Sequence, residues 1–241
     1  MNERRGFIAT IGSLAASGLA AGCAGTPIAD SGGMACQAFD AARQAAITPD
    51  QALALLKEGN ERFAGGKPVR CDLMAQVRAT AQAQAPFAAV VGCIDSRVPP
   101  ELVFDQHIGD IFAARIAGNF VNTDIIGSLE FATQVAGAKL IVVLGHSECG
   151  AIKGAVDDAR LGNLTAMLAN IRPSVARVRV EGAQNSKNKK LVQAVADQNA
   201  RDAAALLAER SEVLRNRVGE RKLRIVSAMH DVASGRVSWF A

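Results

Sequence analysis

Alternating hydrophobic and polar segments divide the chain, from about residue 48 onward, into expected helices and strands. Short and almost wholly apolar runs predict strands that are buried on both faces, at residues 87–92, 111–116, 139–145 and 223–228. Hydrophobic residues at helical spacing fill most of the intervals between these runs. Strands separated by helices predict an α/β fold with a mostly parallel central sheet that is flanked by helices.

The predicted helices carry recognisable start and stop signals. Thr48 before Pro49 is typical of an N-cap followed by proline at the first helical position, and a Gly-Gly pair ends that helix. Further helices are expected at residues 72–82, 123–136, 151–159, 164–179 and 191–218. Residues 231–240 contain an Ala-Ser-Gly turn, which predicts a short antiparallel edge strand at the C-terminal end.

Two of the predicted strands end in potential metal ligands. Cys93 follows the first strand, and His146 and Cys149 follow the third. If these side chains share one site, the first and third strands must be neighbours, with the second strand on the outer side of the first. This requirement predicts the local order 2-1-3, with the site at the carboxyl ends of the strands, where open α/β sheets bind ligands. With the fourth strand placed after the third, the expected order is 2-1-3-4.

Two thiolates and one imidazole form a ligand set that suits zinc. Taken singly, Cys93 could be a buried apolar thiol and His146 a structural histidine, but the combination of three such residues favours a metal site. A structural zinc site usually has four Cys or His ligands, and no fourth lies near these motifs. Either water or Asp95 is therefore expected to complete the coordination.

Asp95 and Arg97 offer a carboxylate and a guanidinium two residues apart. Arg97 can hold the carboxylate in a bidentate pair and keep it ionised. An ionised and oriented carboxylate can accept a hydrogen from an attacking water or hydroxide. The alternative is an ordinary ion pair at a strand end, which the position beside a metal ligand makes the weaker interpretation.

Composition narrows the classes of partner. The 241 residues are 49% hydrophobic, which is ample for one sizeable core, and the formal net charge is +4. Aromatic residues make up only 4% of the chain, and no basic run is interleaved with them. Nucleic acid is therefore not an expected partner.

The N-terminal residues are typical of an export signal. The pair Arg4-Arg5 precedes a short apolar stretch, which favours the twin-arginine route, and Leu19 to Cys23 resembles a lipobox with Cys23 as the acylated residue. Cleavage of the signal at another of the nearby small residues stays open as an alternative.

The chain is thus expected to consist of an export signal at 1–22, a flexible linker at 23–46 and a folded domain at 47–241. The expected location is periplasmic or envelope-associated, with membrane contact only through a lipid on Cys23.

Two cysteines lie outside both the signal and the metal motif. Cys36 and Cys71 could form a disulfide in an oxidising compartment, but their spacing alone leaves the pairing open.

The C-x-D-x-R motif at residues 93–97 and the H-x-x-C motif at residues 146–149 resemble those of the β-class carbonic anhydrases. The resemblance continues through residues 110–119 and 231–237, and it covers essentially the whole domain from about residue 48 to residue 241. It implies the reversible hydration of carbon dioxide to bicarbonate and a proton, carried out by zinc-bound hydroxide. It also implies a homodimer or higher homo-oligomer with its active sites at the subunit interface.

Residue roles follow from the same resemblance. It implies one zinc ion per chain, with Cys93, His146 and Cys149 as ligands and Asp95 and Arg97 as the catalytic dyad. In the plant-like subgroup, Gln84 and the backbone amide of Gly150 would contact the substrate, and the fourth zinc position tends to stay open to water.

The chain departs from the family in having no tyrosine at all, and His230 stands before Asp231 where members often carry tyrosine. Pocket lining and proton transfer therefore cannot be transferred from the family. His107 and His230 are candidate proton shuttles, although structural roles are the stronger interpretation.

Two alternative functions stay open: a hydrolase of carbonyl sulfide or carbon disulfide on the same fold, and a zinc-binding envelope protein without turnover. The intact pair of Asp95 and Arg97 argues against the second.

Overall fold

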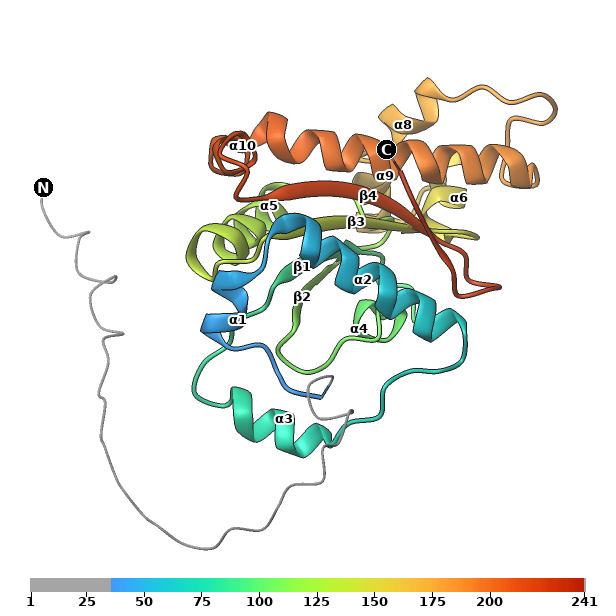
Figure 1. Cartoon of the computed structure of the whole chain (residues 1–241). Coiled ribbons are helices and arrows are strands. Elements are labelled where there is room, and N and C mark those ends of the chain that lie inside the picture. Colours follow the sequence, from blue (N-terminus) through green and yellow to red (C-terminus); the bar gives the residue numbers. More distant parts are fainter. Residues whose placement is uncertain (1–35, 241) are drawn as a thin grey trace, which may run out of the picture. The chain divides into compact units, whose positions relative to one another are not determined.

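A five-stranded sheet forms the centre of the fold, in the order β2-β1-β3-β4-β5 (Figure 1). The structure is a computed structural model, and it describes residues 36–240. The strands are β1 (Ala88–Gly92), β2 (Ile111–Arg115), β3 (Leu140–His146), β4 (Arg224–His230) and β5 (Val237–Trp239). The first four strands are parallel, and β5 pairs antiparallel with β4. The predicted fold class and strand order are confirmed.

Helices fill the connections between these strands. They are α1 (Ala41–Ala46), α2 (Pro49–Ala64), α3 (Leu73–Thr80), α4 (Pro100–Val103), α5 (Thr123–Glu130), the π-helical η1 (Phe131–Val135), α6 (Gly150–Val156), α7 (Gly162–Leu168), α8 (Arg172–Arg177), α9 (Lys189–Arg210) and α10 (Glu212–Gly219). None of the helices in residues 36–240 has both the length and the apolar composition needed to cross a bilayer.

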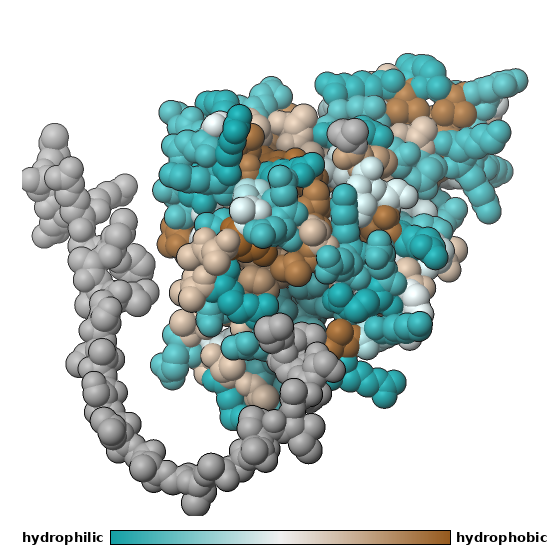
Figure 2. All heavy atoms as spheres, viewed as in Figure 1, coloured by the Kyte–Doolittle hydropathy of each residue, from teal (hydrophilic) through white to brown (hydrophobic). Residues whose placement is uncertain are grey.

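Alternate residues of the two central strands point into two separate cores. Val91 and Val143 belong to a core that α5, α6 and α9 cover, whereas Val90 and Val142 belong to a core that α2 and α4 cover. Both strands are buried along their whole length, which explains why they read as continuous apolar runs. The molecular face drawn in Figure 2 is mainly hydrophilic, with smaller hydrophobic areas towards its centre.

The start of α2 matches its sequence signal. Thr48 Oγ1 accepts a hydrogen bond from the Gln51 amide at 3.2 Å, and the Gln51 side chain accepts one from the Thr48 amide at 2.9 Å. This reciprocal capping box pairs two amides that the helix itself leaves free, and such a cap stabilises a helix by about 1 kcal/mol.

The predicted linker extends too far along the chain. Its last residues form α1, and Gln44 Nε2 donates hydrogen bonds of 2.7 Å to the carbonyls of Pro86 and Ala136. The Phe39 ring lies 4.7 Å from that of Phe87. The described part of this segment therefore packs onto the domain. The predictions for residues 1–35, which include the export signal and Cys23, concern residues outside the described part of the chain.

Two predicted helices are each divided in two. Ser211 ends α9 and also caps α10, because its side chain accepts a hydrogen bond from the Leu214 amide. Pro173 lies in the first turn of α8, after a short break that separates α8 from α7. Hydrophobic periodicity continued through both breaks and gave no sign of them.

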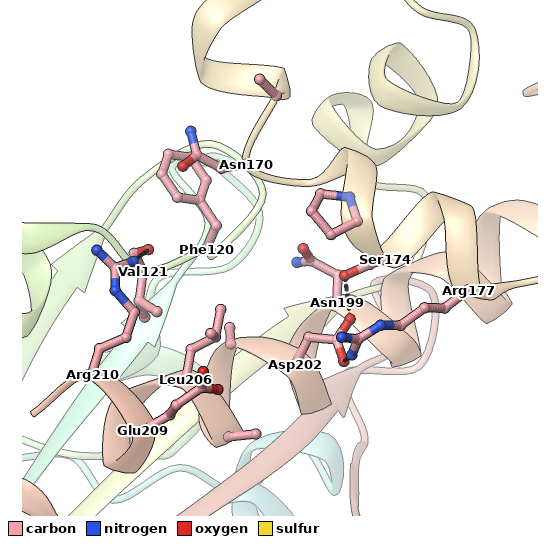
Figure 3. A pocket seen from close by; sticks show the side chains of 14 residues that line it. Phe120, Val121, Asn170, Ser174, Arg177, Asn199, Asp202, Leu206, Glu209 and Arg210 are labelled. Carbon is pink, nitrogen blue, oxygen red and sulfur yellow. Dashed lines mark hydrogen bonds and ion pairs between the residues drawn. The ribbon is translucent and has the colours of Figure 1, made fainter.

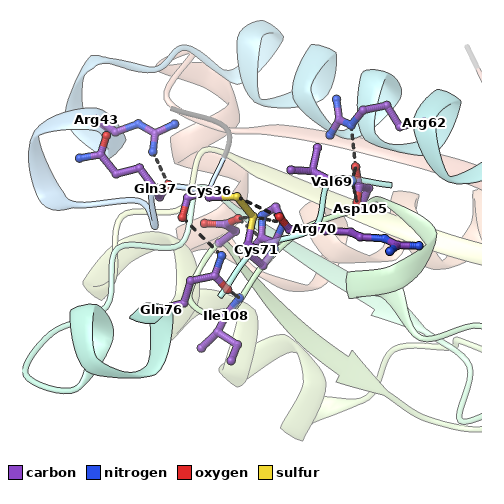
Figure 4. Close-up of a disulfide and its surroundings, with 12 residues drawn as sticks. Cys36, Gln37, Arg43, Arg62, Val69, Arg70, Cys71, Gln76, Asp105 and Ile108 are labelled. Atoms are coloured by element: carbon purple, nitrogen blue, oxygen red, sulfur yellow. Dashed lines mark hydrogen bonds and ion pairs between the residues drawn. A yellow bond between two sulfur atoms is a disulfide. The ribbon is translucent and has the colours of Figure 1, made fainter. Parts of the chain in front are cut away.

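A disulfide joins Cys36 to Cys71 and ties the segment before α1 to the loop before α3 (Figure 4). The pairing that the sequence left open is therefore present. Cys71 Sγ also lies 3.2 Å from His107 Nε2, and His107 Nδ1 lies 3.5 Å from Asp110 Oδ2. This cluster lies at the amino-terminal edge of the sheet, because His107 and Asp110 immediately precede β2.

Candidate metal centre

Three potential ligands converge at the carboxyl ends of β1 and β3. The ligand atoms of Cys93, His146 and Cys149 all lie within 4.8 Å of one another. The two strands are hydrogen-bonded neighbours, and Gly92 pairs with Leu144 at their ends, so the residues that follow emerge side by side. The three residues are 4%, 0% and 1% exposed, respectively. A buried cluster of two thiols and one imidazole is well suited to bind zinc.

A tight turn between β3 and α6 brings His146 and Cys149 together. Glu148 has a φ of 57°, in the left-handed region that reverses the chain, and Cys149 then occupies the N-cap position of α6. The turn is held from β4, because the Ser147 amide donates to the His230 carbonyl at 2.9 Å. Ser147 Oγ accepts a hydrogen bond from the Val232 amide at 3.0 Å. The C-terminal strands thus fix the turn that carries two of the three ligands.

The imidazole of His146 presents one free nitrogen to the cluster. Its Nδ1 lies 2.9 Å from the Ser147 carbonyl oxygen, which can only accept, so Nδ1 carries the hydrogen and donates it. Its Nε2 is buried and has no hydrogen-bond partner. Histidine ligands commonly use one nitrogen for the metal while the other donates to a carbonyl. The unpartnered Nε2 beside two thiols therefore fits a metal ion.

The two thiols influence each other's pKa through a shared hydrogen bond. Hydrogen bonding with Cys149 lowers the pKa of Cys93 to about 4. The same contact with Cys93, together with burial, raises the pKa of Cys149 above its usual value. A metal ion such as zinc would bind both sulfurs as thiolates, so its binding would displace any proton that the pair shares.

Asp95 faces Arg97 in a bidentate ion pair. Arg97 Nε donates to Asp95 Oδ1 at 2.9 Å, and Arg97 Nη2 donates to Asp95 Oδ2 at 2.8 Å. The side-chain hydrogen bond from Arg97 keeps the pKa of Asp95 well below its usual range. Asp95 Oδ2 lies 3.9 Å from His146 Nε2, beside the three ligands and outside their group. The carboxylate is thus ionised, oriented and next to the metal cluster.

Arg115 supports this loop from the neighbouring strand. Arg115 Nε donates to the Cys93 carbonyl at 2.8 Å, and Arg115 Nη2 donates to the Asp95 carbonyl at 2.6 Å. No role for Arg115 was predicted from its position in the sequence. A basic residue at the carboxyl end of the strand predicted beside β1 was the available signal.

Comparison with known proteins agrees with this geometry. The family model described as "Carbonic anhydrase" matches residues 88–237, which is more than half of the chain. "Carbonic anhydrase 2" of Mycobacterium tuberculosis (strain CDC 1551 / Oshkosh) is 36% identical over 194 residues, which cover 78% of this chain and 91% of that protein. The carbonic anhydrase of Mycolicibacterium smegmatis is 35% identical over 195 residues, with 78% and 92% covered.

Solved structures identify the class. One of two tetrameric β-carbonic anhydrases from Sordaria macrospora superposes with a TM-score of 0.59 at 27% identity, covering 76% of this chain and 94% of that one. The chain belongs to the β-carbonic anhydrase family. A fungal β-carbonic anhydrase from Aspergillus fumigatus shares the fold, with a TM-score of 0.61 at 23% identity and 79% of this chain covered.

The remaining residues predicted for a β-carbonic anhydrase site fall in different places. Gly150 directly follows Cys149 and begins α6, next to the metal cluster. Gln84 is exposed in the loop that enters the amino-terminal end of β1, whereas Cys93 follows the carboxyl end of that strand. The fold therefore places Gln84 at the edge of the sheet opposite the metal cluster of its own chain.

The two candidate proton shuttles of this β-carbonic anhydrase, His107 and His230, lie at opposite edges of the sheet. His107 lies at the opposite edge, in the disulfide cluster. His230 pairs in register with His146 on the adjacent strand and is 2% exposed, with both ring nitrogens unpartnered. Burial lowers the pKa of His230. Only His230 lies near the metal cluster.

Proposed function

We propose that this protein hydrates carbon dioxide reversibly to bicarbonate and a proton, with one zinc ion held by Cys93, His146 and Cys149. The observation that carries the proposal is the unpartnered, buried Nε2 of His146 among two thiols, directly beside an ionised carboxylate. A zinc-storage site needs the three ligands but has no use for an oriented carboxylate. The pairing of Asp95 with Arg97 therefore favours turnover.

Each residue has a separate task in this proposal. When bound, zinc supplies Lewis-acid activation of water as the nucleophile. Asp95 would accept a hydrogen bond from that water and so orient the water's lone pair towards the carbon of carbon dioxide. Arg97 keeps Asp95 ionised and fixed, and Arg115 holds the backbone that carries it. The Gly150 amide, one residue after a ligand, is proposed to face a substrate oxygen.

The test is stopped-flow hydration of carbon dioxide by purified protein, with zinc measured on the same sample. We expect turnover that scales with zinc content and is absent from Cys149→Ala. The same preparation is assayed for release of sulfide from carbonyl sulfide and carbon disulfide. Sulfide release without carbon dioxide hydration would support the hydrolase alternative, and full zinc occupancy without any turnover would support a silent zinc-binding protein.

We propose further that the protein works as a homodimer or higher homo-oligomer. The strand β2 lies at the edge of the sheet, and its outer side has no strand partner among residues 36–240. Phe131 and Val135, which lie in η1 after α5, are 50% and 72% exposed. Unpaired strand edges and exposed apolar side chains are features that subunit interfaces cover. Assembly would also allow Gln84 of one subunit to approach the site of another.

Light scattering tests this assembly. We expect Phe131→Arg to lower the measured mass to that of the monomer, while Val218→Arg, on α10, keeps it. A monomeric wild-type protein with full turnover would contradict the proposal.

We also propose export by the twin-arginine route to the periplasm or the envelope. The disulfide between Cys36 and Cys71 supports this, since structural disulfides persist mainly in oxidising compartments. Fractionation of cells that carry Arg4→Lys/Arg5→Lys should find the protein retained in the cytoplasm, and mature protein outside the cytoplasm would refute the route. Labelling with a radioactive fatty acid decides separately whether Cys23 is acylated.

A further inference from the structure

One polar side chain interrupts the apolar face that α9 packs against the sheet. The buried residues of α9 are Leu191, Val192, Val195, Ala196, Asn199, Ala200, Ala203 and Leu207. Asn199 is the only polar member of this set, and it is 2% exposed. Burying an amide is costly unless its groups are hydrogen-bonded, so the partner of Asn199 indicates what the residue does.

That partner is the backbone next to a predicted metal ligand. Asn199 Nδ2 donates to the Gly118 carbonyl at 2.8 Å. The amide of the same glycine donates to Cys93 Sγ at 3.3 Å. Two hydrogen bonds thus connect α9 to the sulfur of Cys93, across a sequence separation of more than 100 residues between Asn199 and Cys93.

The backbone at this point needs support from outside. Gly118 has a φ of 82° and Asn119 has a φ of 43°, so two successive residues are in the left-handed region. A Cβ on residue 118 would lie 2.5 Å from Ile171 Cδ1 and 3.2 Å from Ala151 Cβ, and at this φ a side chain would be strained, so the position favours glycine. Gly118 has no side chain that could hold its peptide group in place. Asn199 holds it instead, through the hydrogen bond to the Gly118 carbonyl.

We propose that Asn199 is a positioning residue for the metal centre: it holds Gly118 so that the Gly118 amide points at the sulfur of Cys93. This inference rests on the proposed zinc site. An N–H donor aimed at a thiolate stabilises its negative charge and fixes the direction of its lone pairs. Loss of such an outer contact typically weakens metal binding by about 10- to 100-fold.

A neighbouring residue provides a matched control. Asn199 lines a cavity of about 350 Å³ between α8 and α9, together with Ser174 and Asp202 (Figure 3). Ser174 is also 2% exposed, and its hydroxyl donates to Asp202 Oδ2 at 2.6 Å. Ser174 thus resembles Asn199 in burial and in its place on the cavity wall, but it does not bond to Gly118.

The experiment compares Asn199→Leu, Asn199→Asp and Ser174→Ala with the wild-type protein. Leucine keeps the approximate volume without a donor, and aspartate keeps the shape but places an acceptor against the Gly118 carbonyl. Zinc affinity is measured by competition with a chromophoric chelator. The sulfur-to-metal charge-transfer absorption of the cobalt-substituted protein reports the bonds that Cys93 and Cys149 make to the metal. Urea unfolding of the metal-free proteins reports stability separately.

We expect both Asn199 variants to bind zinc at least about tenfold more weakly and to shift the charge-transfer band. Ser174→Ala should keep the affinity and the band of the wild type, even if it loses stability. Asn199 variants that lose only apo stability, with zinc affinity and cobalt spectrum unchanged, would overturn the inference. If Asn199→Leu does not fold, Asn199→Asp decides alone. A wild-type protein without zinc affinity would instead overturn the proposed function.

Discussion

Two clusters of the same composition lie at opposite edges of one sheet. Each contains two cysteines, one histidine and one aspartate. At the carboxyl edge these are Cys93, Cys149, His146 and Asp95, and at the amino-terminal edge they are Cys36, Cys71, His107 and Asp110. The first pair of cysteines is free, and the second pair forms a disulfide. Residue type alone therefore does not decide what such a cluster does.

Burial separates the two pairs of cysteines. Cys93 and Cys149 are buried, whereas Cys36 and Cys71 are only half-buried and can be reached by an oxidant. The histidines differ as well. His146 leaves Nε2 free among the sulfurs, while His107 turns one nitrogen to Cys71 Sγ and the other towards Asp110. An imidazole nitrogen that is free among two buried thiols fits a metal ion, whereas the second cluster fastens the chain through its disulfide.

The largest effect is expected from removing cysteines from each cluster in turn. Cys149→Ala should lose zinc and all carbon dioxide hydration, because two ligands cannot hold the ion tightly. The matched double variant Cys36→Ala/Cys71→Ala should keep one zinc per chain and its turnover. Metal analysis and stopped-flow assays of both proteins check this. Zinc loss from the double variant would show that the two clusters are not independent.

The next largest effect on turnover is expected from replacing the aspartate of each cluster, Asp95 or Asp110. Asp95→Asn should keep zinc but slow hydration by about 100-fold or more, since the attacking water loses its hydrogen acceptor. Arg97 lowers the pKa of Asp95, so the carboxylate is already ionised at neutral pH, and the deficit should be the same at neutral and alkaline pH. Turnover of the wild type should still rise towards alkaline pH. Asp110→Asn is the control and should leave turnover unchanged.

An Asp95→Asn enzyme as fast as the wild type would remove Asp95 from the mechanism. A deficit that vanishes at alkaline pH would show that Asp95 acts through its own titration, which contradicts the lowered pKa.

The disulfide should contribute stability without contributing activity. It closes a loop with a sequence separation of 35 residues, and removing such a link costs about 3 kcal/mol of unfolding free energy, or roughly 10 °C in melting temperature. Calorimetry of zinc-loaded Cys36→Ala/Cys71→Ala against the wild type measures this. An unchanged melting temperature would mean that Gln44 and Phe39 already hold the segment in place.

The carboxyl-edge cluster could be predicted from the sequence, because its ligands lie directly beside local sequence patterns. Its ligands follow strands that read as unbroken apolar runs, and the need for Cys93 to meet His146 fixed the strand order. The contacts that support the cluster could not be predicted in the same way. Arg115 and Asn199 act through backbone carbonyls that lie far from them in sequence, and such contacts leave no spacing pattern.

The amino-terminal edge was harder to predict for a related reason. Residues 36–46 have no hydrophobic periodicity, and their structure depends on contacts with distant residues, such as those of Gln44 with Pro86 and Ala136. The pairing of Cys36 with Cys71 follows from the same packing. A local sequence pattern cannot predict the structure of a segment that tertiary contacts hold in place.

The smallest expected effect concerns the charge of His107. Its hydrogen bond with Asp110, aided by the negative charges of Asp110 and Asp105, raises the pKa of His107 above its ordinary value. A pKa raised by folding stabilises the protein fully below the unfolded value of about 6.5, and this contribution disappears as pH rises through the folded value. His107→Gln should therefore lower the urea midpoint more at about pH 5.5 than at about pH 9. The comparison is made on zinc-loaded proteins, with zinc content verified at each pH. A midpoint difference that grows towards alkaline pH would mean that His107 acts mainly as a neutral partner of the disulfide.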